Sequence, residues 1–187
     1  MATELRSMSS EQSEKTILLV DDEENIIRSI KRILRKEGYR ILTANSGQEG
    51  LNVLKENSVG VIISDQRMPE MSGVEFLSQV KKLYPDTVRI VLSGYTDLNS
   101  VTDAINQGAI YRFLTKPWDD ELLITNIRDA FKSYGLYKEN QRLNAELGRL
   151  NQKLENRVDE QNRESNIKQK MLQYTQHVMD SQPVGIL

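Results

Sequence analysis

The chain has 187 residues, enough for one domain of ordinary size and a shorter extension. Its 25 basic and 27 acidic side chains give a formal net charge of -2, so no overall positive field draws it to nucleic acid or acidic lipid. Cysteine is absent, which excludes disulfides, thiolate metal sites and cysteine nucleophiles. The apolar runs are far shorter than the roughly 18 residues of a membrane helix, and no signal-peptide pattern opens the chain. We therefore expect a cytoplasmic protein with no membrane contact.

Two kinds of segment alternate after a polar, aperiodic start at residues 1–14, which we expect to form a flexible tail. Short runs rich in Val, Ile and Leu predict five strands, at Thr16–Val20, Arg40–Ala44, Val59–Ser64, Val88–Leu92 and Ile110–Leu114. Amphipathic stretches between them predict helices at Glu24–Glu37, after Ser46, at Ser72–Tyr84 and at Asp97–Gln107. This order predicts an α/β fold with a doubly wound, five-stranded parallel sheet. The functional site should lie at the carboxyl ends of the strands.

The residues that follow the strands carry the chemistry. Asp21 and Asp22 follow the first strand, Asp65 the third, Ser93 the fourth and Lys116 the fifth. Three carboxylates at one edge repel one another unless some are protonated or a cation is bound. Oxygen ligands without sulfur favour Mg²⁺ or Mn²⁺. One such carboxylate alone would more often cap the next helix, but the joint pattern indicates metal-assisted phosphoryl transfer to an aspartate.

Four separated motifs resemble the receiver domain of two-component response regulators. They are Ile17–Glu23, Ser64–Gly73, Leu92–Gly94 and Phe113–Pro117, and both their order and their spacing match. The resemblance spans about residues 15–133. It implies a flavodoxin-like receiver with strand order 2-1-3-4-5.

The resemblance also implies how the acidic residues act. Asp65 would be the phosphoacceptor, taking a phosphoryl group from a histidine kinase or a phosphotransfer protein. Asp21, Asp22, Asp65 and the backbone carbonyl of Arg67 would hold Mg²⁺. The protein would then not be an enzyme in the usual sense, because it would catalyse only its own phosphorylation and a slow self-dephosphorylation.

A second group of residues would read the phosphorylated state. By the resemblance, Lys116 and Ser93 bind the phosphoryl group, and Ser93 and Phe113 form the switch pair, the hydroxyl moving to the phosphate and the ring moving inward. Pro117 would resemble the family's cis-proline. Tyr95 and Arg67 are bulky at positions that vary in the family, which favours slow phosphate loss, whereas the small Gly94 favours a more open site.

A long helical pattern starts near Asp119 and meets no proline until Pro183. About sixty helical residues would reach roughly 90 Å, more than one small domain can cover, so a paired helix is favoured over an isolated one. Heptad spacing relates Leu136, Leu143, Leu147, Leu150 and Leu154. We expect a coiled-coil linker at 134–175 that forms a parallel homodimer, weakened where Arg157–Asn166 is nearly all polar. Its mixed charges predict no direct contact with nucleic acid.

The final residues, 176–187, resemble the opening of a PAS domain, in which a helix leads into a Pro-x-Gly turn and a strand. An output domain would then begin here. The alternative that His177 is the phosphodonor of a kinase is disfavoured, because the residues after it lack the expected acidic partner and proline turn. A solvent-facing histidine is the better interpretation.

We therefore predict a phosphorylation-dependent signalling switch that relays its state through the C-terminal helix to an output domain. Two other functions stay open. A phosphorylation-independent dimerisation scaffold would not need the full set of phosphorylation residues, which this chain has. An aspartate-nucleophile phosphatase would need Asp-x-Asp after the first strand and a substrate cap, and the chain has neither.

Overall fold

The computed structural model describes residues 15–94, 103–106 and 108–180. The chain divides into two compact units, Met1–Lys138 and Glu139–Leu187. The domain limits drawn from the sequence, at 1–14, 15–133, 134–175 and 176–187, stay predictions.

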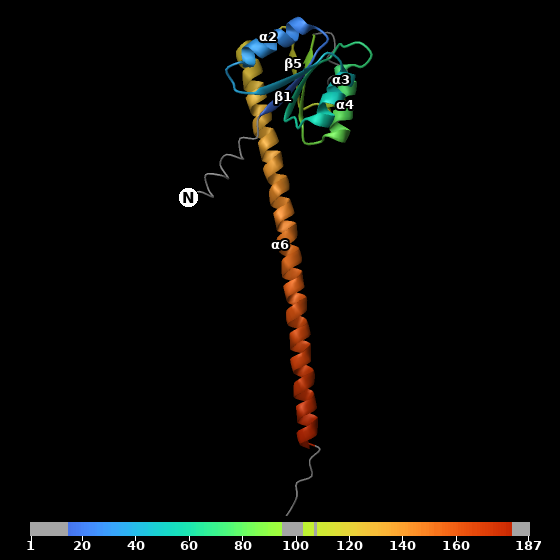
Figure 1. The fold of residues 1–187 in the computed structure, drawn as a ribbon, viewed down its shortest axis with the longest axis vertical. Helices are drawn as coiled ribbons and strands as arrows, with labels where there is room; N and C mark the ends of the chain where they lie inside the picture. The colour runs from blue at the N-terminus through green and yellow to red at the C-terminus, as the bar shows by residue number, and fades with distance from the viewer. Residues whose placement is uncertain (1–14, 95–102, 107, 181–187) are drawn as a thin grey trace, which may run out of the picture. The chain divides into compact units, whose positions relative to one another are not determined.

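The first unit is built on a five-stranded parallel sheet in the order β2-β1-β3-β4-β5, as predicted. Figure 1 shows the sheet between helices, with β1 and β5 labelled. Its strands are β1 (Thr16–Val20), β2 (Arg40–Ala44), β3 (Val61–Asp65), β4 (Val88–Ser93) and β5 (Arg112–Thr115). Every residue of β1 and β3 is buried, which explains why these strands show no alternation of polar and apolar residues. The edge strands β2 and β5 are partly exposed.

Helices cover both faces of the sheet. The helices are α2 (Glu24–Leu34), α3 (Gly47–Glu56), α4 (Gly73–Leu83) and α6 (Asp120–Asp180). On one face, α3 and α4 bury Leu51, Leu54 and Phe76 against the strands. On the other, α2 and the start of α6 bury side chains that include Ile30 and Leu123. The two apolar clusters confirm the three-layer, doubly wound arrangement.

The predicted strands differ from the observed ones mainly at their starts. The bounds of β1 and β2 were predicted to the residue, but β3 begins two residues later than expected, at Val61. The carbonyl of Val59 accepts a hydrogen bond from the Thr87 hydroxyl at 2.9 Å. β5 begins at Arg112, because Gly108, at φ +69°, and Ala109 still close the preceding helical turn through bonds to the carbonyls at 105 and 104.

The predicted helices also end slightly differently. α2 ends at Leu34, three residues before the predicted end at Glu37, and the turn that follows closes with Gly38 at φ +72°. The helix predicted at Asp97–Gln107 lies largely outside the described residues, although residues 103–106 are helical. The long helix begins at Asp120, one residue after the predicted start.

Ion pairs hold the first part of α6 to the sheet domain. Arg128 donates to both carboxylate oxygens of Glu37, at 2.9 and 2.8 Å. Lys138 Nζ lies 2.6 Å from Asp86 Oδ2, at the last residue of the first unit. The Phe131 ring stacks on Tyr39 with 4.9 Å between ring centroids.

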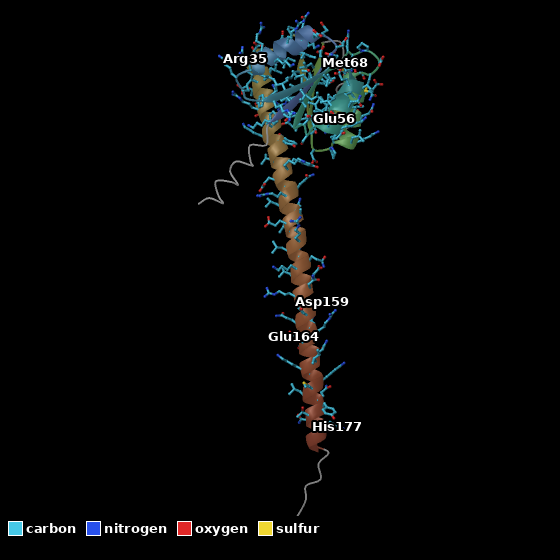
Figure 2. The ribbon with its side chains drawn as sticks, in the orientation of Figure 1. Arg35, Glu56, Met68, Asp159, Glu164 and His177 are labelled. Carbon is cyan, nitrogen blue, oxygen red and sulfur yellow. The ribbon has the colours of Figure 1, made fainter. Side chains whose placement is uncertain are left out.

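The second unit is helical from Glu139 to Asp180. This helix includes residues 176–180, the start of the segment that resembles a PAS domain. The rest of that segment, 181–187, lies outside the described residues. Asp159, Glu164 and His177 project from the helix into solvent (Figure 2). The five leucines at heptad spacing, which we call the leucine seam, are also exposed: Leu136, Leu143, Leu147, Leu150 and Leu154. Within the described residues, no helix is both long and apolar enough to cross a bilayer.

Candidate functional site

Three carboxylates meet at the carboxyl edge of the sheet. Asp21 follows the last residue of β1, and Asp65 is the last residue of the adjacent β3. Asp21 and Asp65 are buried, whereas Asp22 is exposed. One carboxylate oxygen from each of the three residues lies within 4.8 Å of the others. The structure therefore brings together the acidic residues that the sequence placed at separate strand ends.

Lys116 brings a positive charge into this cluster from the end of β5. Its ammonium lies 2.5 Å from Asp65 Oδ1 and 3.1 Å from Asp21 Oδ2. The peptide bond between Lys116 and Pro117 is cis. The sequence pattern predicted that the carboxylates need a cation, and in this structure the lysine supplies part of that charge.

Backbone amides orient the two buried carboxylates. The amide of Glu23 donates to Asp21 Oδ1 at 2.9 Å, and that of Arg67 donates to Asp65 Oδ2 at 2.7 Å. These hydrogen bonds hold each carboxylate in one orientation. Sequence reasoning considered only the carbonyl of Arg67, because a backbone donor leaves no signature in residue type.

The loop after Asp65 depends on Gly73, whose role the sequence reasoning did not single out. The Gly73 amide donates to the Gln66 carbonyl at 3.0 Å. A Cβ atom at Gly73 would lie 2.1 Å from the carbonyl oxygen of Asp65. The side chain of the buried Gln66 also accepts from the amide of Val74 at 3.2 Å. Only glycine lets α4 begin so close to the acidic cluster.

The cluster shifts the pKa of two of its members. Burial raises the pKa of Asp21, and this effect exceeds the opposing effects of the Glu23 amide and of Lys116. Burial also acts to lower the pKa of Lys116, but hydrogen bonds and charges from Asp65 and Asp21 outweigh it, so this pKa is raised. The lysine therefore stays protonated between the two aspartates at neutral pH.

Ser93 and Phe113 lie on neighbouring strands. Ser93 is fully buried at the end of β4, and its hydroxyl donates to the carbonyl of Gly94 at 3.1 Å. Phe113 lies in β5 opposite Val91, with 36% of its surface exposed. The ring is thus at the protein surface, while the hydroxyl is inside the sheet.

The residues present fit a magnesium ion. Three aspartates against one lysine leave an excess of negative charge, and all the side-chain donors are carboxylate oxygens, the ligands that Mg²⁺ prefers. Among the described residues, this is the group of acidic side chains close enough to share one cation. Asp22, which is exposed, leaves the cluster open on the solvent side.

Comparisons with known proteins agree with this arrangement. Residues 17–128 match the family model described as the response regulator receiver domain. The hydrogenase transcriptional regulatory protein HoxA of Cupriavidus necator is 41% identical over 140 residues, which are 75% of this chain and 28% of that protein. The chain thus spans little more than a quarter of that curated relative.

Two solved structures are also similar. An uncharacterized protein from Neptuniibacter caesariensis is 46% identical, with a TM-score of 0.66, over 68% of this chain and 94% of that one. A response regulator receiver domain protein from Clostridium thermocellum is 36% identical, with a TM-score of 0.61, over 65% of this chain and 97% of that one. With the matching family model, the sheet order and the acidic cluster, these likenesses show that the chain belongs to the response regulator receiver domain family.

Proposed function

We propose that this chain is a phosphorylation-dependent switch that accepts a phosphoryl group on Asp65 from a histidine kinase or a phosphotransfer protein. The observation that carries the proposal is the geometry around Asp65, a buried carboxylate at the end of β3 that shares its edge of the sheet with two further aspartates and Lys116. The chain would catalyse nothing beyond its own phosphorylation and a slow self-dephosphorylation.

Each residue of the cluster has a separate task in this proposal. An oxygen of Asp65 attacks the phosphorus of a phosphohistidine, and the P–N bond breaks as the imidazole leaves. The Arg67 amide fixes the Asp65 carboxylate through its other oxygen, Oδ2. Lys116, 2.5 Å from Asp65, stabilises negative charge on the transferred group. Asp21, Asp22, Asp65 and the carbonyl of Arg67 would hold Mg²⁺, whose positive charge offsets that of the phosphoryl oxygens.

Ser93 and Phe113 would report the modification. In the present arrangement, the Ser93 hydroxyl donates to the carbonyl of the next residue and the Phe113 ring lies at the surface. These positions support a resting state in which neither side chain is engaged with a phosphate. On phosphorylation, the hydroxyl would turn to the phosphoryl oxygen, and the ring would move inward.

The signal would leave through α6. This helix begins at Asp120, four residues beyond Lys116, and runs to Asp180. The exposed leucine seam supports a parallel homodimer in which two receivers share one pair of helices. The output domain, proposed to follow residue 176, would read a change in that pair. HoxA is named as a transcriptional regulatory protein, but the output of this chain is not thereby assigned.

The test is phosphorylation of the full chain by a small phosphodonor such as acetyl phosphate with Mg²⁺, measured by intact mass. We expect one added phosphoryl group in the wild type and none in Asp65→Asn, because an amide is a poor nucleophile. Asp159→Asn, on the exposed part of α6, is the matched control and should be modified like the wild type. A wild-type chain that takes up no phosphate would favour the scaffold. Modification of Asp21 or Asp22 in Asp65→Asn would contradict the choice of acceptor.

A further inference from the structure

Asn140 interrupts the leucine seam of α6. The leucines fall on two alternating heptad positions, d at Leu136, Leu143 and Leu150, and a at Leu147 and Leu154. In the same heptad frame, the a position between Leu136 and Leu143 falls on Asn140. Asn140 therefore lies on the same face of the helix as the leucines, in a place where a coiled coil would ordinarily carry an apolar side chain.

The carboxamide of Asn140 is exposed in the single chain. Its Oδ1 accepts a hydrogen bond from Nδ2 of Asn144, one turn later, at 2.7 Å. Pairing two such helices would remove Asn140 from water. A buried amide that lacks a partner is costly, so it favours the arrangement in which two amides meet each other. In a parallel pair, that is the in-register arrangement of two chains.

The residues that flank the seam favour the parallel orientation. Glu139 and Glu146 are at g positions, and Asn144 and Asn151 are at e positions. In a parallel pair, g of one helix faces e of the other, so each glutamate meets an asparagine amide that can donate to it. In an antiparallel pair, g faces g, so chains aligned on Glu146 would bring the two Glu146 carboxylates together, while Glu139 would face Lys153, also at g. An a position then faces a d position, so Asn140 would meet a leucine and its amide would stay unpaired. Glu139 also accepts from Arg142 of its own helix at 2.8 Å, which leaves other lone pairs of its carboxylate for a second donor.

We propose that Asn140 fixes the register of a parallel coiled coil between two copies of this chain and limits the assembly to two. The occupant of the leucine seam is then a second copy of α6, aligned so that the two Asn140 side chains meet. The inference rests on the dimer proposed above. It names Asn140 as the residue that selects the stoichiometry. It also implies that Asn140 makes the pair less stable than an apolar residue at this position would.

The test compares the full wild-type chain with three variants by sedimentation equilibrium and by thermal dissociation of the helix pair. Asn140→Leu should raise the dissociation midpoint and yield species heavier than a dimer, because leucine then fills every a and d position from 136 to 154 and nothing polar restricts the seam. Asn140→Lys should stay dimeric with a lower midpoint, since lysine at one a position also specifies two strands. Asn162→Leu makes the same substitution at a b position, outside the seam, and should match the wild type.

Several outcomes would overturn the inference. An Asn140→Leu chain that stays strictly dimeric with an unchanged midpoint would show that Asn140 selects nothing. A wild type that is monomeric, or larger than a dimer, at high micromolar concentration would refute the pair itself. Fluorescence of the single tryptophan, Trp118, checks that the receiver of each variant is folded. Phosphate uptake, measured on the same samples, separates these failures from a failure of the proposed switch, because no variant changes the acidic cluster.

Discussion

Gly73 shows how the site depends on a residue with no side chain. We expect Gly73→Ala to lower the free energy of unfolding by about 1–3 kcal/mol, because the new methyl group would lie 2.1 Å from the carbonyl oxygen of Asp65 and the backbone must shift. The displaced carboxylate should also slow phosphorylation. The matched control is Gly135→Ala in α6, where nothing lies within 4 Å and alanine should stabilise the helix by about 0.5–1 kcal/mol. Urea denaturation and the rate of phosphate uptake measure both effects, and a Gly73→Ala protein like the control would contradict this role.

Asp22 tests whether the carboxylates repel one another. In the absence of Mg²⁺, we expect Asp22→Ala to be more stable than the wild type, because one of three clustered negative charges is gone while Lys116 remains between the other two. The same variant should gain less stability from added Mg²⁺. Denaturation with and without Mg²⁺ measures both changes. A variant that is less stable than the wild type without metal would mean that Lys116 already balances the cluster.

At the residue scale, the sequence predicted which side chains meet but not what orients them. Asp21, Asp65 and Lys116 could be placed together because parallel strands end at one edge of a sheet. The backbone amides of Glu23 and Arg67 could not be predicted as their hydrogen-bond donors. Every residue except proline has a backbone N–H, and only the loop conformation decides where that N–H points. The sequence also did not predict that the Lys116 ammonium would lie between Asp21 and Asp65, because the resemblance assigns this ammonium to the phosphoryl group.

At the scale of elements, the start of α4 is set by a reciprocal pair of hydrogen bonds. The Ser72 hydroxyl accepts from the Glu75 amide at 3.3 Å, while the Glu75 carboxylate accepts from the Ser72 amide at 2.8 Å. These bonds from Ser72 lower the pKa of Glu75 below its ordinary value of 4.5. A lowered pKa means that the carboxylate contributes stability above pH 4.5, and that this contribution is lost as the pH falls through the folded-state pKa.

We therefore expect the advantage of the wild type over Glu75→Gln in free energy of unfolding to shrink as the pH is lowered from neutral to below 4.5. Glutamine keeps an acceptor for the cap but does not titrate, so it isolates the charge. Ser72→Ala should cost about 1 kcal/mol at neutral pH, because it leaves the Glu75 amide without its cap. Urea denaturation over this pH range measures both variants. An unchanged difference between wild type and Glu75→Gln would show that the carboxylate charge contributes nothing to the cap.

Element types were predictable here because the hydrophobic patterns are long and regular, but the starts of β3 and β5 were not. At the start of α3, the Ser46 hydroxyl accepts from the Glu49 amide at 3.2 Å, while the Glu49 carboxylate accepts from the amide of Asn45, one residue before the cap, at 2.8 Å. Individual hydrogen bonds also precede the late starts of β3 and β5: the Thr87 hydroxyl bonds to the Val59 carbonyl, and Gly108 and Ala109 close a helical turn. A hydrophobic pattern contains neither the first of these bonds, which joins residues 28 positions apart, nor the loop conformation on which the second depends.

At the scale of the whole molecule, the first unit has its own buried core, whereas every seam leucine of α6 is at least 47% exposed in a single chain. Leu147 and Leu150 have 58% and 50% of their surface exposed, at the middle of the seam. Covering them against a second helix would contribute about 1 kcal/mol for each leucine, since part of each is already covered. The core of the first unit needs neither residue, so pairing and phosphorylation should be separable.

We expect the wild-type chain to be a parallel dimer and the double variant Leu147→Lys with Leu150→Lys to be a monomer that still accepts phosphate at Asp65. Two lysines per chain remove the apolar contact at adjacent a and d positions and place four like charges in one seam. Light scattering gives the mass, and intact-mass analysis after treatment with a phosphodonor gives the modification. The control replaces Gln152 and Arg149, on the opposite side of the helix, with lysine and should stay dimeric. A cysteine placed at Glu146 reports the orientation of the helices, because the chain has no other cysteine. Cross-links that require antiparallel helices would refute the parallel dimer. A double variant that loses phosphate uptake together with the dimer would refute the expected separation of pairing and phosphorylation.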